Sequence, residues 1–140
     1  MSGTILLHAS CVALNGRGLL ITGPSGSGKS SLALQLMALG ADLIADDQTE
    51  VSRDGTDLVA RCPATLRGLI EARGVGILRA DPADRAVVIL VADLSQLETD
   101  RLPPRRRVTI LGCEVDLVLR VQDHHFHQAV MLYLARGRYA

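Results

Sequence analysis

The chain carries no excess charge of either sign, because its 15 lysine and arginine residues are balanced by 15 aspartate and glutamate residues. Such a chain has no long-range field to attract nucleic acid or an anionic membrane, so neither is expected as a partner. Cysteine is also scarce: Cys11, Cys62 and Cys113 are far apart, and no C-x-x-C pair is present. This spacing excludes the usual zinc and redox motifs and predicts small core residues in a reducing cytosol.

Long apolar segments are missing as well. The longest plainly apolar run, residues 86–92, is far too short to span a bilayer, and the N-terminus lacks a basic stretch ahead of an apolar core. We find no internal repeat, low-complexity tract or obvious linker. With 48% hydrophobic residues, residues 1–140 are predicted to form one soluble, cytoplasmic domain with its own core.

One stretch stands out against this background. Residues 23–30 read Gly-Pro-Ser-Gly-Ser-Gly-Lys-Ser, follow the apolar run 18–22 and fit the pattern G-x-x-x-x-G-K-[ST] of a P-loop. Phosphate oxygens are densely charged, and glycines let backbone N–H groups turn toward them with no Cβ in the way. The alternative is a glycine-rich turn that only resembles the motif. The predicted nucleotide-binding residues are Gly23, Pro24, Ser25, Gly26, Ser27, Gly28, Lys29, Ser30 and Ser31.

Two side chains of this stretch have a defined role in a P-loop. The Lys29 ammonium reaches the β and γ phosphates, and the Ser30 hydroxyl is offered to Mg²⁺. Residues 30–39 are helix formers closed by Gly40, and they predict a helix whose positive dipole end points at the phosphates. ATP and Mg²⁺ are therefore the predicted cofactors.

The remaining patterns predict a mixed sheet. Apolar stretches on either side of Asn15-Gly16 and of Asp54-Gly55 are typical of hairpins. Further strands are predicted at 41–45, 86–92, 108–111 and 114–121, and further helices at 64–72 and after a capping Asp123. The predicted fold class is α/β, a P-loop nucleotide-binding domain with a mixed sheet and antiparallel hairpins.

Two places compete for the acid that accompanies a P-loop. Asp46 and Asp47 end the strand 41–45, and one of them is expected to meet the γ-phosphate or a substrate hydroxyl, because parallel strands deliver their C-terminal ends to the P-loop edge. The plainer alternative is the entry of a turn, where aspartates are common. Asp93 follows the strand 86–92, and by pattern alone it is the better Walker B candidate.

Several polar residues carry little information by themselves. His8, inside the first predicted strand 4–14, is either a hydrogen-bonded core residue or a catalytic one. Glu71 and Arg73 are more typical of a solvated charge pair, and the arginines of 105–107 form either a solvated face or a grip for phosphate or an acidic partner. Three histidines within 124–127 suggest a metal site, but no additional ligand supports it.

Together these motifs resemble the catalytic domain of HPr kinase/phosphorylase, the P-loop enzyme of bacterial phosphotransferase-system regulation. Residues 43–47 (Leu-Ile-Ala-Asp-Asp) are similar to the family's Ala-Asp-Asp strand end, and residues 70–78 (Ile-Glu-Ala-Arg-Gly-Val-Gly-Ile-Leu) to its signature Glu-x-Arg-Gly-Leu-Gly-Ile. His8 stands fifteen residues before the P-loop, as the family's active-site histidine does, and residues 100–102 resemble its Asp-Arg-Leu. The resemblance covers the chain from about residue 8 to residue 101.

The resemblance implies the fold shared by HPr kinase and PEP carboxykinase, and a set of roles. Lys29 and Mg²⁺ would neutralise phosphate charge, with Ser30 and Glu71 as metal ligands. Asp47 would accept the proton of the attacking hydroxyl, adjusted by His8. The catalytic residues implied are His8, Lys29, Asp46, Asp47, Arg73 and Arg101, the last of which stabilises the transferring charge.

The implied activity is ATP-dependent phosphorylation of a serine on HPr or an HPr-like phosphocarrier protein, by a homo-oligomer that is a hexamer in the family. The chain is expected to be a short form without the family's N-terminal domain. Residues 108–115 stand in place of a Pro-Val-Arg-Pro-Gly-Arg-Asn-like segment, so weak or absent phosphorylase activity is expected. The alternatives are a small-molecule kinase or NTPase that shares only the P-loop, and a non-catalytic, nucleotide-gated regulatory module.

Overall fold

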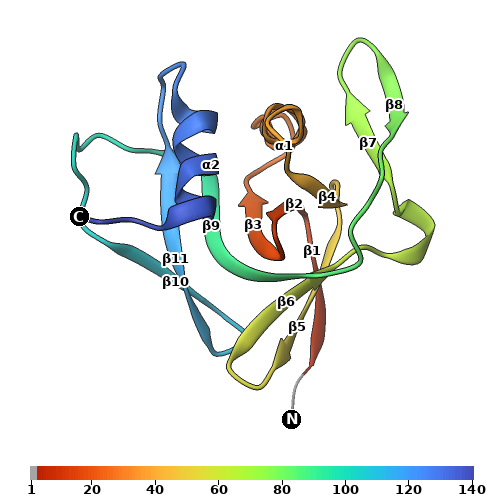
Figure 1. Cartoon of the computed structure of the whole chain (residues 1–140), viewed down its shortest axis with the longest axis horizontal. Coiled ribbons are helices and arrows are strands. Elements are labelled where there is room, and N and C mark those ends of the chain that lie inside the picture. The colour runs from red at the N-terminus through yellow and green to blue at the C-terminus, as the bar shows by residue number, and fades with distance from the viewer. Residues whose placement is uncertain (1–2) are drawn as a thin grey trace.

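Two helices pack on one face of a large mixed sheet in the computed structural model, which describes residues 3–140 (Figure 1). The strands are β1 (Thr4–Leu7), β2 (Ala9–Leu14), β3 (Arg17–Thr22), β4 (Asp42–Ala45), β5 (Thr49–Asp54), β6 (Asp57–Arg61), β7 (Leu69–Ala72), β8 (Gly76–Arg79), β9 (Ala86–Leu97), β10 (Arg106–Ile110) and β11 (Cys113–Arg120). The helices are α1 (Lys29–Ala38) and α2 (Phe126–Arg136), with a 3₁₀ turn η1 (Ala64–Leu66). Within residues 3–140, neither helix has the length and apolar character needed to cross a membrane.

The long strand β9 lies at the centre of the sheet because it pairs with three other strands. β3 and β11 run parallel to it, and β6 pairs antiparallel with its first residues. The strand order is β1-β5-β6-β9-β3-β2-β4, with β11 also paired to β9 and β10 paired to β11. The apolar run 86–92 of β9 packs into the clusters on both faces of the sheet, as its unbroken hydrophobic pattern indicates. The carboxyl ends of β3, β9 and β11 therefore share one edge.

The side chains of β3 show how the two faces divide. Leu19 and Ile21 point toward the helices and pack with Leu36 of α1 and Leu134 of α2. Leu20, between them, belongs to the cluster on the opposite face. This is the alternation expected of a strand with both faces covered. The burial holds α1 and the loop before it against the carboxyl end of β3.

The hairpins predicted at Asn15-Gly16 and Asp54-Gly55 are confirmed as β2–β3 and β5–β6. The predicted helix 64–72 is wrong, since only Ala64–Leu66 is helical and Leu69–Ala72 forms the hairpin β7–β8 with Gly76–Arg79. The physical reason is Gly68, which has φ +76° and turns the chain out of the helical direction. The hairpin projects beside α1 (Figure 1).

Three further boundaries differ from the prediction. The first predicted strand breaks at His8, between β1 and β2, and β9 continues past Asp93 to Leu97. Asp123 is not the helix cap: α2 starts after His125 without a side-chain cap, and the Asp123 carboxylate instead accepts the His125 N–H at 3.3 Å. The length of β9 is set by its pairing with β11, and a local residue pattern does not show such pairing.

The cysteines and the C-terminal segment complete the fold. Cys11 and Cys113 are buried as predicted, Cys62 is only half-buried, and all three are free thiols.

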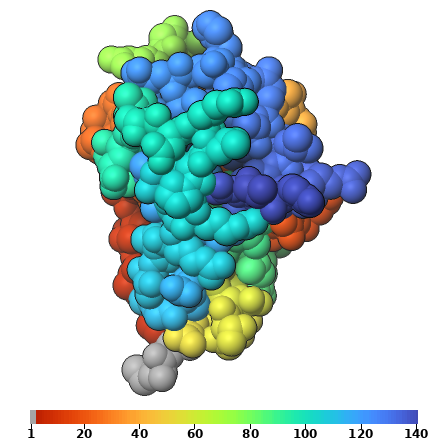
Figure 2. Space-filling model, turned by 90° about the vertical axis from the view of Figure 1, so that its left-hand side faces the viewer, coloured from red at the N-terminus to blue at the C-terminus, as the bar shows by residue number. Residues whose placement is uncertain are grey.

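Figure 2 shows the face on which the last residues lie across the loop 98–105. There Arg138 donates to the Pro103 carbonyl, and Arg105 donates to the Arg138 carbonyl at 3.2 Å.

Candidate active site

The loop of residues 23–28 joins β3 to α1, as the P-loop pattern requires. Gly23 has φ +145°, and a Cβ there would lie 2.6 Å from the Ser27 hydroxyl, so the turn closes only with glycine. Gly28 precedes α1 with φ +98° in open space, and no side chain caps the helix. The first N–H groups of α1 are thus left for an external acceptor, and phosphate oxygens suit them.

Lys29 lies inside this loop. Its side chain is buried, with 6% of the residue exposed, and its ammonium donates to the carbonyls of Gly23 at 2.8 Å and Pro24 at 3.0 Å. An ammonium held by neutral carbonyls gains stronger bonds when phosphate oxygens are offered instead, because the acceptor then carries the opposite charge. The Ser27 hydroxyl in the same loop is buried and has no hydrogen-bond partner among residues 3–140. The loop therefore fits a phosphate chain.

Asp46 connects three separate parts of the chain. One carboxylate oxygen accepts the Ser10 hydroxyl at 2.8 Å and the Ser30 hydroxyl at 2.7 Å, and the other accepts the Glu71 backbone N–H at 3.0 Å. A buried carboxylate needs such donors to offset its lost hydration. Because Ser30 gives its proton to Asp46, the lone pairs of its oxygen remain for a cation. Asp46 therefore holds the Ser30 hydroxyl and the Glu71 backbone, the two residues predicted as metal ligands.

Asp47 is turned the other way. It has φ +68°, and the Gln48 N–H donates to the Asp46 carbonyl at 2.8 Å, which makes Asp47 the centre of a three-residue γ-turn. A γ-turn with positive φ at its centre is rare and strained. The Asp47 N–H donates to the Ser10 hydroxyl at 3.2 Å, which holds the turn in place. The two neighbouring carboxylates thus part, one buried and one exposed.

His8 faces the exposed acid. Its Nε2 lies 3.6 Å from the Asp47 carboxylate and 3.5 Å from the Ser25 hydroxyl, and half of its side chain is exposed. It is therefore not the buried core histidine that a position inside an apolar strand suggests. The break between β1 and β2 turns it to the surface. An ion pair this exposed adds little stability, so its interest is chemical.

These residues surround one cavity of about 190 Å³. Its lining comes from the P-loop, the start of α1, the residue before β2, the turn after β4 and the β7–β8 hairpin. The lining residues are His8, Ser25, Gly26, Gly28, Lys29, Ser30, Ser31, Asp47, Glu71 and Arg73. We call it the phosphate pocket. A serine hydroxyl and a carboxylate are oxygen ligands of the kind that Mg²⁺ takes, usually one or two from protein and the rest from phosphates and water. The phosphate pocket therefore fits Mg²⁺ as well.

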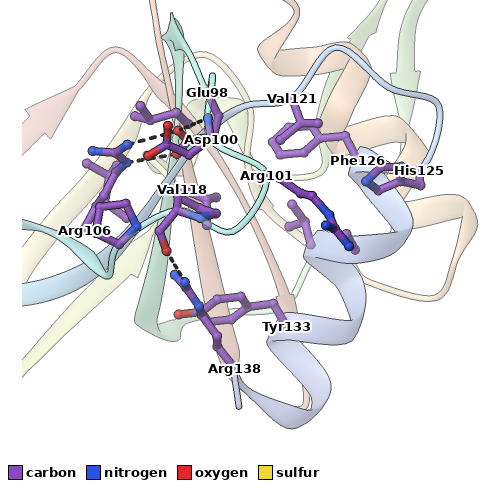
Figure 3. Close-up of a pocket in the computed structure, with 16 residues that line it drawn as sticks. Glu98, Asp100, Arg101, Arg106, Val118, Val121, His125, Phe126, Tyr133 and Arg138 are labelled. Atoms are coloured by element: carbon purple, nitrogen blue, oxygen red, sulfur yellow. Dashed lines mark hydrogen bonds and ion pairs between the residues drawn. The ribbon is translucent and has the colours of Figure 1, made fainter. Parts of the chain in front are cut away.

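Two residues that the sequence offered for the site, Arg101 and Asp93, do not line the phosphate pocket. Arg101 lines a separate, more apolar cavity of about 340 Å³ against α2 and β11, next to the paired Glu98 and Arg106 (Figure 3). The Arg106 guanidinium donates to both Glu98 oxygens, at 2.9 and 3.0 Å, and so lowers the pKa of that carboxyl to about 2. The Asp93 carboxylate accepts a hydrogen bond from the Ser95 hydroxyl at 2.6 Å. Asp46, and not Asp93, holds the P-loop serine.

Sequence reasoning missed Ser10. It is fully buried in β2, and its hydroxyl joins the Asp46 carboxylate to the Asp47 backbone. Its signal was faint: one polar residue in the apolar run Ala9–Leu14, two positions after His8. The histidines of 124–127, which suggested a metal site without a supporting ligand, gain none from the fold: residues 3–140 contain no group of three His, Cys, Asp or Glu side chains placed to hold an ion.

A glycine-rich loop between a parallel strand and a helix, beneath a cavity lined by acids, defines an α/β domain of P-loop architecture. The comparison with known proteins makes this specific. The chain belongs to the HPr Serine kinase C-terminal domain family, whose sequence model matches residues 1–83.

Several relatives are known by name. The HPr kinase/phosphorylase of Aromatoleum aromaticum is 51% identical over 129 residues, which cover 82% of this chain and 41% of the relative. That of Bordetella avium is 36% identical over 115 residues, covering 74% and 37%. The chain thus spans about two-fifths of the length of these curated relatives. The solved structure of the Hpr(Ser) kinase/phosphatase from Coxiella burnetii is similar with a TM-score of 0.78 and 26% identity over 95% of each chain, which confirms the predicted fold class.

Proposed function

We propose that residues 1–140 form a single catalytic domain that transfers the γ-phosphoryl group of ATP, with Mg²⁺, to a serine of HPr or an HPr-like phosphocarrier protein. The observation that carries this proposal is the phosphate pocket, where Lys29 and Ser30 of the P-loop face Asp47 and Glu71. Phosphoryl transfer needs charge neutralisation on one side and a positioned acceptor on the other. The phosphate pocket offers side chains suited to both tasks.

Charge neutralisation falls to the P-loop side. Lys29 exchanges its loop carbonyls for β and γ oxygens, and the N–H groups at the start of α1 bind the same chain. Ser30 and Glu71 hold Mg²⁺, which supplies positive charge against the phosphates. Asp46 orients both ligands without facing the cavity itself.

Activation of the acceptor falls to the opposite wall. Asp47 takes the proton of the serine hydroxyl as the new oxygen–phosphorus bond forms and the bond to the departing ADP breaks. His8, 3.6 Å away, orients that carboxylate. Arg73 from the β7–β8 hairpin contributes positive charge at the mouth of the pocket.

Arg101 requires a different arrangement. Within one chain it lines the other cavity and not the phosphate pocket. We assign its predicted charge-stabilising role to a neighbouring copy in a homo-oligomer, as the family resemblance implies. The proposed compartment is the cytoplasm, where ATP and phosphocarrier proteins meet.

The test is incubation of the purified protein with γ-labelled ATP, Mg²⁺ and a panel of purified phosphocarrier proteins. Label on the serine of a carrier is expected, and a carrier with that serine replaced by alanine is the control. Phosphate release without carrier labelling indicates the NTPase alternative, and nucleotide binding without turnover indicates the regulatory module. Either result refutes the kinase proposal.

The reverse direction is tested with the labelled carrier. Phosphorolysis consumes inorganic phosphate and phosphoserine and yields pyrophosphate. Since residues 108–115 lack the arginine-bearing segment, pyrophosphate release at millimolar phosphate should be far slower than forward transfer. Comparable rates would show that this segment is dispensable for phosphorolysis.

A further inference from the structure

A second cavity, of about 500 Å³, lies between the N-terminal ends of α1 and α2. Its lining includes Leu32 and Gln35 of α1, Leu94 of β9, and Phe126 and Gln128 of α2. It stands at the carboxyl ends of the parallel strands β3, β9 and β11, where ligands bind in open α/β sheets. We call it the interhelical cavity.

The interhelical cavity adjoins the phosphate pocket. Both are lined by Gly28 and Ser31, at the first turn of α1. Ser27, whose buried hydroxyl has no partner among the described residues, lines the interhelical cavity only. The two cavities therefore lie on either side of the first turn of α1, close enough for us to infer that one elongated ligand reaches both.

The direction of a bound triphosphate follows from the position of the side chains proposed for catalysis. His8, Asp47 and Glu71 line only the phosphate pocket, so the γ-phosphate and the acceptor hydroxyl belong there. The chain of three phosphates then runs along the P-loop toward the start of α1, whose N–H groups take the α and β phosphates. The group attached to the α-phosphate leaves past Ser31, on the side away from Asp47 and Glu71.

The lining of the interhelical cavity suits a nucleoside. A base needs apolar or aromatic contact for its faces and donors and acceptors at its edge. Leu32, Leu94 and Phe126 offer the first, and the exposed amides of Gln35 and Gln128, each able to donate and accept, offer the second. Figure 3 shows Phe126 at the start of α2, beside Val121.

We propose that the interhelical cavity binds the nucleoside of the nucleoside triphosphate whose phosphates occupy the P-loop. This proposal rests on the proposed function and adds the location of the nucleoside and the residues that contact it. The proposal also assigns a role to the histidine-rich segment 124–127, because His124 and His127 line this cavity. The 340 Å³ cavity beyond Phe126 shares no P-loop residue and is the weaker candidate.

The experiment compares Mg-ATP with magnesium tripolyphosphate, which has the three phosphates and no nucleoside. Phe126→Ala should weaken ATP binding about tenfold or more, because a base loses its stacking partner. Binding of tripolyphosphate should stay at the wild-type level. Leu132→Ala, at an exposed position of α2 outside both cavities, is the matched control and should change neither.

A second measurement does not depend on Phe126. The chain has no tryptophan, so Gln35→Trp places a single fluorophore in the interhelical cavity. Its emission should change on ATP addition and not on tripolyphosphate addition, and Leu132→Trp should respond to neither. This variant alters an exposed position and carries the test if Phe126→Ala does not fold.

Four outcomes overturn the proposal. Equal effects of Phe126→Ala on ATP and tripolyphosphate place the defect in the P-loop, and an unchanged ATP affinity or a silent Gln35→Trp places the nucleoside elsewhere. If wild-type protein binds neither ligand, the proposed kinase function fails and this inference fails with it. If both ligands bind and only the variants disagree, the nucleoside site alone is refuted.

Discussion

Ser10 and Asp46 meet across the antiparallel pair β2–β4, where the buried Ser10 hydroxyl donates to the Asp46 carboxylate at 2.8 Å. The same hydroxyl accepts the Asp47 N–H at 3.2 Å. One oxygen thus binds both members of the Asp-Asp pair and supports the strained turn that sends Asp47 into the phosphate pocket. Ser10 does not line the phosphate pocket, and we infer that it acts by positioning the acids.

Ser10→Ala should therefore slow phosphoryl transfer about 10- to 100-fold, since a displaced base costs rate steeply. Mg-ATP affinity should remain close to wild type, because Ser30 still holds Asp46. The variant leaves buried polar groups short of a partner and should lower the free energy of unfolding by about 1–3 kcal/mol. Single-turnover transfer, ATP titration and denaturant unfolding measure the three quantities.

Thr49→Val is the matched control for this variant. Thr49 is equally buried, and its hydroxyl donates only to the Ala9 carbonyl, at 2.8 Å. Its loss should cost similar stability and leave transfer intact. Equal kinetic defects in Ser10→Ala and Thr49→Val would reduce Ser10 to a structural hydroxyl, whereas restored transfer in Ser10→Thr would support positioning.

A pair of isosteric variants distinguishes Asp47 from Asp93 as the acid that takes part in transfer. Asp47→Asn should lower the rate of transfer about 10²–10⁴-fold, the usual contribution of a general base, while Mg-ATP still binds. Asp93→Asn should act mildly, because its partners are Ser95 and Gln96 of its own strand. Single-turnover assays with equilibrium ATP binding decide the matter. Lost transfer in Asp93→Asn with normal transfer in Asp47→Asn would contradict the assigned roles.

Lys29 is the only lysine of the chain, which allows a direct chemical test. Lys29→Ala should abolish transfer and leave the fold intact, because the phosphates lose their point-charge partner. In the wild-type protein, Mg-ATP should protect Lys29 from acylation by an amine-reactive reagent, followed by peptide mass spectrometry. Unchanged transfer by folded Lys29→Ala, or acylation indifferent to ATP, would remove the P-loop from the mechanism.

Arg101 provides a test of assembly. If the arginine serves the phosphate pocket of a second copy, Arg101→Ala and Lys29→Ala should each be inactive alone and should regain part of the activity when mixed. Arg73→Ala, which changes a residue of the phosphate pocket itself, should be inactive alone and should not recover with Lys29→Ala. Absence of complementation in the first mixture would confine all catalytic groups to one chain.

The Glu98–Arg106 pair predicts a pH dependence of stability. Arg106 lowers the pKa of Glu98 from its usual value of 4.5 to about 2, so the ionised carboxylate stabilises the folded state. This contribution is complete above the usual value and disappears as the pH falls toward 2. The difference in thermal midpoint between wild type and Glu98→Gln should be constant above pH 5 and shrink below it. A difference independent of pH would show that the pair adds only packing.

Much of this protein was readable from neighbouring residues. Glycine spacing in 23–30 predicted the P-loop, Asn15-Gly16 and Asp54-Gly55 predicted their hairpins, and the apolar run 86–92 predicted a buried strand. These patterns are local, because turn chemistry and strand periodicity depend on residues a few positions apart. The error at 64–72 has the same origin: the pairing of β7 with β8 through a glycine turn outweighed weak helix propensity.

The tertiary structure alone decided which acid contacts the P-loop serine. Asp93 had the better local pattern, yet Asp46 binds Ser30, because β4 follows β2 in the sheet and brings its end to Ser10 and the P-loop. Ser10 and Asp46 are 36 positions apart, a distance that residue pattern does not bridge. Strand order sets such meetings through hydrogen-bond pairing and burial over the whole sheet, and the same order placed Arg101 outside the pocket and opened the interhelical cavity beside it.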